Sequence, residues 1–217
     1  MADNYLEKRY EEVFGSGASR KTVVKRVGES LDRLLLKNRS HRSFDPAIGV
    51  TPEQLRRIIS VNSKLPSARN QQVLRFRPVT EESEVSAVLR HIRLGAALPE
   101  LHLPPEGQEP KAYIVVCSTA PEGRYVDIDL GISIQSMLLK TVEMGLNGIC
   151  ICAFERAAVI DALHLPFEPL AILAIGRGAD KIRLVPIHEG DSQHYYRTDE
   201  GVHCVPKLQL DDLIIGN

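Results

Sequence analysis

The segment 126–144 is apolar on almost every side, and it limits the possible folds of this chain more than any other feature. A helix of this length that is apolar all round lies at the centre of a domain or at a subunit interface. Gly145 follows it and supplies a helix end. No segment of the chain approaches the ~20 uninterrupted apolar residues of a membrane helix. The apolar positions of the segment are Ile128, Leu130, Ile132, Ile134, Met137, Leu138, Leu139 and Val142.

The remaining elements predict one α+β domain with a mostly antiparallel or mixed sheet. Apolar spacing and turn residues predict helices over 2–14, 21–37, 82–93 and 156–163, and a helix that starts at Thr51-Pro52 and ends at Pro66. Strands are expected over 74–79, 112–117, 149–154 and 170–175, and Pro78 indicates an edge strand. Residues 98–110 are rich in proline and read as a long lid or binding loop. We expect a single domain over 1–217, with a helical N-terminal extension over 1–30 and a C-terminal tail over 186–217.

Composition excludes several classes of protein. The chain has 43% hydrophobic residues and a net charge of −1, so disorder and general nucleic-acid binding are both disfavoured. The polar N-terminus lacks the apolar region of a secretory signal. The chain has only four cysteines, which favours reduced thiols in the cytoplasm. The pair Cys150 and Cys152 lies in an apolar run, and we interpret it as buried structural thiols rather than a metal site.

A cluster of basic residues over 37–42 is the first candidate site. Residues 1–44 carry ten Lys and Arg against six Asp and Glu, which gives +4 in a nearly neutral chain. Arg39 and Arg42 offer planar donors that fit a phosphate, and Ser40 adds a hydroxyl. The alternative is a solvated helix end, where basic residues are favourable in any case.

Two further loops are weaker candidates. The loop 66–72 carries Asn and Gln amides that suit the edge of a uracil-like ring, although it is also an ordinary turn sequence. The segment 175–180 contains Gly176-Arg177-Gly178, where a backbone free of side chains and an arginine could complete an anion site. A glycine turn with a surface arginine is the alternative. The chain has no G-x-S-x-G, H-E-x-x-H or P-loop pattern, so a cofactor is expected to carry any chemistry.

The order of these motifs resembles the FMN-dependent nitroreductase family over about residues 31–185. Its R-S-x-R-x-F element is matched at 39–44, and its P-S-x-x-N-x-Q element at 66–72. Asp129 and Gly131 match the start of its long central helix. The turn after its next strand is matched at 152–155, and its last strand at 170–176. Relatives often carry a second arginine at Asn38 and a tryptophan at Leu74, and this chain has neither.

The resemblance implies a nitroreductase-like three-layer α/β sandwich with a mixed, mostly antiparallel central sheet, dimeric with swapped extensions. It implies that Arg39, Ser40 and Arg42 hold the phosphate and ribityl chain of FMN, with Gly176 and Arg177 near the phosphate. Ser67 and Asn70, with Gln72 as a further candidate, would reach the flavin ring from the partner subunit. The backbone of Cys152 and Ala153 would face the flavin N5 region. The other cofactor-binding candidates within these motifs are His41, Pro66 and Ala68.

The function implied is a cytoplasmic, homodimeric flavoprotein oxidoreductase. It would pass hydride from NADH or NADPH through FMN to a quinone- or nitro-type acceptor, with no catalytic side chain, metal, nucleic acid or membrane involved. A flavin-binding module or sensor without efficient turnover is the alternative, and a Cys/His metal protein is a weaker one.

Overall fold

The computed structural model describes residues 28–95 and 101–216. Residues Leu31–Asn217 form one compact unit. The expected helix 2–14 and most of the expected extension 1–30 lie outside the described residues. The described part of the helix expected over 21–37 is α2, Leu31–Lys37, and residues 28–30 are not helical.

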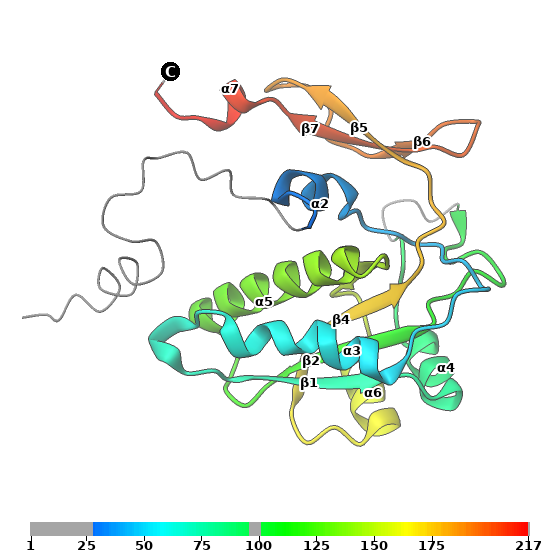
Figure 1. The fold of residues 1–217 in the computed structure, drawn as a ribbon, viewed down its shortest axis with the longest axis vertical. Helices are drawn as coiled ribbons and strands as arrows, with labels where there is room; N and C mark the ends of the chain where they lie inside the picture. Colours follow the sequence, from blue (N-terminus) through cyan, green and yellow to red (C-terminus); the bar gives the residue numbers. More distant parts are fainter. Residues whose placement is uncertain (1–27, 96–100, 217) are drawn as a thin grey trace, which may run out of the picture. The chain divides into compact units, whose positions relative to one another are not determined.

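A four-stranded antiparallel sheet forms the centre of the fold (Figure 1). Its order is β1 (Leu74–Val79), β2 (Ala112–Ser118), β4 (Glu168–Gly176) and β3 (Asn147–Ile151). All four strands were expected from the sequence. Pro78 lies on β1, which is an edge strand as predicted. Proline has no backbone N–H to donate, and an edge strand tolerates this because it pairs on one side only.

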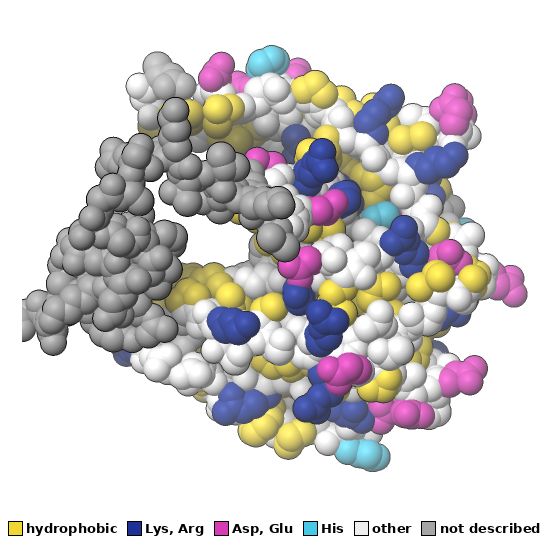
Figure 2. All heavy atoms as spheres, viewed as in Figure 1, with side chains coloured by type: hydrophobic (Ala, Val, Ile, Leu, Met, Phe, Trp, Pro, Cys, Tyr) yellow, Lys and Arg dark blue, Asp and Glu magenta, His cyan; other side chains and the backbone are white. Residues whose placement is uncertain are grey.

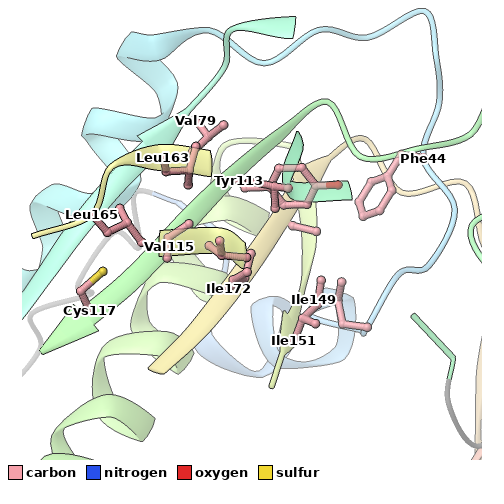
Figure 3. Packing of buried hydrophobic residues seen from close by; sticks show 13 residues of the cluster. Phe44, Val79, Tyr113, Val115, Cys117, Ile149, Ile151, Leu163, Leu165 and Ile172 are labelled. Carbon is pink, nitrogen blue, oxygen red and sulfur yellow. The ribbon is translucent and has the colours of Figure 1, made fainter. Parts of the chain in front are cut away.

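Helices cover both faces of this sheet. On one face lie α3 (Pro52–Ile59) and α5 (Arg124–Glu143), and on the other α4 (Glu82–Arg90) and α6 (Arg156–Leu163). Successive side chains of β2 alternate between the two cores, so Ile114 packs with α3 and α5 while Val115 packs with α4 and α6. Figure 3 shows the second of these cores, with Tyr113, Val115 and Ile172 between the helices and the sheet. This three-layer arrangement around an antiparallel sheet confirms the predicted α/β sandwich, and the dimer with swapped extensions stays a prediction.

The long apolar helix is central, as its sequence predicts. It buries one side against the sheet, through residues such as Met137 and Val142. Its other side leaves large apolar side chains in solvent, because Tyr125 is 54% and Ile128 47% exposed. None of the helices in the described ranges is long and apolar enough to cross a membrane.

The predicted start of α3 is confirmed in atomic detail. Thr51 Oγ1 accepts a hydrogen bond from the Gln54 backbone N–H at 3.2 Å, and Gln54 Oε1 accepts one from the Thr51 N–H at 2.8 Å. Together these bonds satisfy two amide groups that a helix start leaves free. The helix ends at Ile59, earlier than predicted, and passes into the 3-10 helix η1 (Ser60–Lys64) before Pro66.

A second sheet follows where the sequence indicated only a tail. Its order is β5 (Ile182–Ile187), β7 (His203–Leu208) and β6 (Tyr196–Arg197), and the short helix α7 (Leu210–Leu213) comes after it. Strands β5 and β7 are parallel, whereas β6 and β7 are antiparallel. Three strands and the loops between them therefore bring new side chains to the candidate site.

Candidate functional site

The R-S-x-R-x-F segment is fixed between α2 and the two sheets. Arg39 Nη2 donates to the Leu35 carbonyl of α2 at 2.7 Å. Ser40 forms a parallel bridge with Gly148 of β3, and the His41 N–H donates to the Gly148 carbonyl at 3.3 Å. Phe44 is completely buried in the core. This arrangement turns Arg39, Ser40 and Arg42 towards one pocket and His41 towards another.

Arg39, Ser40 and Arg42 line one pocket of about 310 Å³, as the predicted phosphate site requires. The C-terminal sheet and the loop before it supply the opposite wall. The other lining residues are Asn38, Ile182, Tyr195, His203, Val205 and Lys207. The pocket therefore combines three cationic side chains with a hydroxyl, an amide and an imidazole.

Arg42 is held from several directions. Its guanidinium lies over the Tyr195 ring, 5.2 Å from the ring centroid, and its Nη1 donates to the Ser40 carbonyl at 3.2 Å. The same Nη1 lies 3.4 Å from Nε2 of His203. A cation over an aromatic face is stabilised by the ring quadrupole, so this stacking limits the motion of the guanidinium.

The buried carboxylate of Asp180 fixes the backbone beside the pocket. The side chain of Asp180 is only 4% exposed. Its Oδ2 accepts the backbone N–H groups of Arg42 and Ser43, at 2.6 and 2.9 Å, and its Oδ1 accepts from Arg197 Nη2 at 2.9 Å. A charge buried to this degree is stable only when it is paired and hydrogen-bonded. Asp180 therefore fixes the backbone at Arg42 and joins it to β6.

The guanidinium groups of the pocket keep free donors. Nε of Arg39 and Nε of Arg42 are buried and have no hydrogen-bond partner among the described residues. Burial lowers the pKa of Arg39, which is the signature of a cation that lacks a counter-charge. These donors fit a phosphate, which would accept from both groups.

Two histidines at the site are held in their neutral forms. Burial lowers the pKa of His203, and the neighbouring charges of Arg42 and Arg197 lower it further, against an opposing effect of Asp180. Burial likewise lowers the pKa of His41, while Asp180, 3.8 Å from its Nδ1, opposes the shift. Neutral His203 can accept from Arg42 through Nε2, so it supports the arginine without adding a charge of its own.

His41 and Arg177 do not share the pocket of Arg39 and Arg42. They line a separate hollow of about 280 Å³ with Gly145, Asn147 and other residues. Arg177 Nη1 donates to the Gly145 carbonyl. The sequence grouped Arg177 with the other two arginines, and this structure separates them.

The glycines beside Arg177 make room for the protein's own side chains. A Cβ on Gly176 would lie 2.7 Å from Cδ1 of Phe44, and a Cβ on Gly178 only 2.3 Å from Nδ1 of His41. The close approach expected at the glycines is therefore made by the side chains of Phe44 and His41, which belong to the R-S-x-R-x-F segment. A role for Gly176 in cofactor binding stays a prediction.

The second motif forms a separate polar loop. Pro66, Ser67 and Gln72 line a pocket of about 160 Å³. It shares no lining residue with the pocket of Arg39 and Arg42, the arginine pocket. Ser67 Oγ accepts from the Gln72 N–H at 3.1 Å, and Gln72 Nε2 donates to Asn70 Oδ1 at 3.1 Å. The Ala68 N–H donates to Asp129 of α5 at 2.8 Å. One chain thus holds the two motifs apart, and their union through a partner subunit stays a prediction.

Backbone conformation marks this loop as unusual. Arg69, Asn70 and Gln72 have φ values of 54°, 53° and 49°, in the left-handed region that non-glycine residues rarely adopt. The Arg69 guanidinium lies 5.5 Å from the centroid of the Tyr125 ring. Such conformations cost of order 1–3 kcal/mol each and persist only where the surroundings enforce them. Asn70 and Gln72 are exposed, so this strain supports a binding role for the loop.

Cys152 and Ala153 follow β3 and are both exposed. The Ala153 carbonyl accepts from the Arg93 N–H at 2.9 Å, which fixes the backbone at this point. The structure places neither residue in the arginine pocket or in the pocket at 66–72. Their predicted position beside a flavin stays a prediction.

Sequence reasoning missed the contribution of the C-terminal sheet to the site. His203, Val205 and Lys207 all line the arginine pocket because alternate residues of β7 share one face. The run His-Cys-Val-Pro-Lys-Leu over 203–208 does not alternate regularly between polar and apolar side chains, so no local pattern indicated this strand. Figure 2 shows basic, acidic and apolar side chains interspersed on the face in view, so that face is not a continuous basic surface.

No group of three or more His, Cys, Asp and Glu in the described part of the chain is placed to hold a metal ion. Among the described residues, four further side chains have a buried polar atom without a hydrogen-bond partner: His41, Tyr113, Arg197 and His203. Burial strongly raises the pKa of Tyr113. It lies within the core and does not line the arginine pocket.

Comparisons with known proteins agree with this architecture. Residues 110–177 match the model of the nitroreductase family. No curated protein matches the chain. A nitroreductase family protein from Clostridium novyi NT superposes with a TM-score of 0.58 at 19% identity, covering 70% of this chain and 87% of that one.

Two further structures have cofactors in their descriptions. An Exiguobacterium sibiricum 255-15 nitroreductase in complex with FMN has a TM-score of 0.58 at 16% identity, covering 71% of this chain and 91% of its own. An FMN and NADPH-dependent nitroreductase from Sphigopyxis sp. strain HMH has a TM-score of 0.56 at 20% identity, covering 69% and 89%.

These likenesses define the chain first as a protein of the nitroreductase fold. The match over 110–177 spans β2, α5, β3, α6 and β4, and so covers most of the central sheet. The resemblance of this chain to the nitroreductase family, predicted from the order of its motifs, is confirmed.

Proposed function

We propose that this protein is an FMN-dependent oxidoreductase that acts as a homodimer. The observation that carries the proposal is the pocket of Arg39, Ser40 and Arg42, with its two unpartnered buried guanidinium nitrogens, within a nitroreductase fold. FMN is the ligand of one structural neighbour and has a phosphate group that fits those donors. NADH or NADPH is the proposed reductant, since another neighbour is described as NADPH-dependent.

In this proposal, some residues of the pocket contact the FMN phosphate directly and others hold Arg42 in place. Arg39 and Arg42 would neutralise the phosphate, and Ser40 and Lys207 would supply further donors beside it. Asp180 and Tyr195 orient Arg42, and neutral His203 accepts from it. The bound flavin would supply hydride transfer from NAD(P)H to a quinone- or nitro-type acceptor, and no side-chain nucleophile is required.

A second subunit is needed to complete the site in this proposal. Ser67, Asn70 and Gln72 lie outside the arginine pocket of their own chain. The exposed apolar side chains on α5, Tyr125 and Ile128, offer a surface for a partner to bury. Sedimentation analysis tests this part of the proposal, and a protein that stays monomeric at micromolar concentration with FMN present would contradict it.

The test of the cofactor is direct. The purified protein should bind FMN and show a flavin absorption spectrum. Arg42→Ala should weaken FMN binding by about 1.5–3 kcal/mol, because it removes a charge-assisted contact. Arg56→Ala, which removes an exposed arginine of α3 outside the pocket, is the matched control and should leave the affinity unchanged.

The same preparation separates turnover from binding alone. Anaerobic addition of NADH and NADPH should bleach the bound flavin, and a quinone or nitroarene should restore its colour. Flavin that binds tightly but is not reduced by either nucleotide would favour the binding module or sensor. Failure to take up FMN at all would refute the proposed function.

A further inference from the structure

Two cysteines at the end of β3 lie close together outside both pockets. Cys150 is in the strand, paired with Leu173, and Cys152 follows the last residue of the strand. Residues two apart along a strand point to the same side, and here the two Sγ atoms are 3.9 Å apart. The sequence predicted buried structural thiols at both positions, but Cys152 is exposed and Cys150 is only partly buried. The prediction of burial is therefore wrong for Cys152.

The other two cysteines differ from this pair. Cys117 is 3% and Cys204 0% exposed, and neither forms a sulfur–sulfur contact among the described residues. The pair at β3 also has no third His, Cys, Asp or Glu placed with it in the described ranges, so a metal site is not supported there. An exposed thiol beside a second thiol is suited to reversible oxidation.

We propose that Cys150 and Cys152 form a reversible dithiol–disulfide pair that reacts with small disulfides. The thiolate of Cys152 attacks one sulfur of the small disulfide, forms a mixed disulfide and releases one small thiolate, which takes up a proton. The sulfur of Cys150 then loses its proton and attacks Sγ of Cys152, so the intramolecular disulfide forms and the bond from Sγ of Cys152 to the small thiol breaks. The expelled second small thiolate takes up the proton. The two protein thiols lose two electrons and two protons, and the small disulfide gains them as two thiols.

The order of these steps follows from exposure. Cys152 is accessible to a solute, whereas Cys150 packs against Leu173 and its neighbours in the core cluster on the α5 side of the sheet. Burial, and to a lesser extent the neighbouring Cys152, raises the pKa of the Cys150 thiol to about 12. Cys150 therefore stays protonated in the reduced protein and acts second, when Cys152 already carries the mixed disulfide and lies within reach.

The local backbone permits the bond to form. A disulfide needs its sulfur atoms about 2.05 Å apart, so the two sulfurs have to approach by roughly 2 Å. The last paired residues of the strand are Ile151 and Ile172, and Cys152 lies beyond them. Its side chain can therefore turn towards Cys150 without breaking a pair of the ladder, while the Arg93–Ala153 hydrogen bond holds the backbone that follows. The proposal does not depend on a flavin, and its test can be made with and without FMN.

The experiment uses the full-length protein and oxidised glutathione. After incubation, free thiols are blocked with iodoacetamide and the peptides are analysed by mass spectrometry. The wild type should carry an intramolecular disulfide in the peptide that spans 150–152, with both other cysteines alkylated after unfolding. Cys150→Ser should stop at one glutathione per chain on Cys152, and Cys152→Ser should not react. Dithiothreitol should restore both thiols.

Controls keep the proposal refutable. Cys117→Ala should react as the wild type does, and Cys150→Ala replaces Cys150→Ser if the serine variant does not fold. Thermal unfolding establishes that each variant tested is folded. A wild type that accumulates the glutathione adduct without the internal disulfide would overturn the proposal, as would a Cys150 variant that fails to form the adduct.

Discussion

Asp180 is the residue whose removal tests the architecture of the site most directly. Its carboxylate joins two backbone N–H groups of the R-S-x-R-x-F segment to Arg197 of the C-terminal sheet. Asp180→Ala leaves these three donors without an acceptor in a place where the carboxylate was only 4% exposed. Breaking a buried ion pair by removing one partner costs about 3–5 kcal/mol. A domain of this kind is stable by about 5–15 kcal/mol in total, so the loss should be large.

Asp180→Asn separates the charge from the hydrogen bonds. The asparagine can keep one oxygen on the backbone N–H groups of Arg42 and Ser43, but its amide then faces Arg197. We expect it to lose about 1.5–3 kcal/mol, the value of a hydrogen bond to a charged group, and so to lie between the wild type and the alanine variant. Urea unfolding followed by far-ultraviolet circular dichroism measures the free energy of each.

The control is Asp161→Ala, which removes an exposed aspartate of α6 and should change the stability by no more than about 0.5 kcal/mol. A loss below about 1 kcal/mol for Asp180→Ala would refute the reasoning, because a buried carboxylate with three donors could not then be organising the segment.

Two other perturbations address the same region. Gly178→Ala should destabilise the protein by about 1–3 kcal/mol, because its Cβ would overlap the imidazole of His41; the cost should fall when His41→Ala is also present. Gly49→Ala, where a Cβ meets nothing within 4 Å, is the matched control and should be neutral or stabilising in the same unfolding assay. The second perturbation is pH. Burial and two neighbouring arginines lower the pKa of His203, so the unfolded chain binds a proton at a higher pH than the folded one, and stability should decline as the pH falls below about 6.5 towards the lowered pKa. His203→Gln should flatten this decline in melting temperature between pH 8 and 5, and an unchanged slope would contradict the shift.

Local sequence patterns predicted the central sheet and its helices well. The run over 112–117 has the continuous apolar character of a strand buried on both faces, and 156–163 forms α6 at the predicted residues. The C-terminal sheet escaped prediction because prolines interrupt its strands. Pro186 lies at the edge of that sheet, and Pro206 of β7 lies beyond the two residues that pair with β6, so each is tolerated only by the tertiary arrangement.

The site was predictable only in its local parts. The spacing of Arg39 and Arg42 indicated a phosphate pocket, and both line one pocket in the structure. Asp180, which fixes the backbone at Arg42, lies 138 residues from it along the chain, and no local pattern specifies that contact. Arg177 is the opposite case. Its neighbours in the sequence indicated a phosphate contact, but they could not indicate the bond that its Nη1 donates to the Gly145 carbonyl in the structure.

The bridge between Ser40 and Gly148 has a consequence for solubility. β3 is at one end of the four-stranded sheet, and Ser40 and His41 occupy the hydrogen-bonding groups of Gly148 on that strand. The opposite end is protected differently, by Pro78 and the arginines of β1. An uncovered edge is a template for intermolecular strand pairing. Substitutions that loosen residues 39–42 would therefore promote aggregation as well as disturb the proposed phosphate pocket, because the same short segment lines that pocket on one side and shields the sheet on the other.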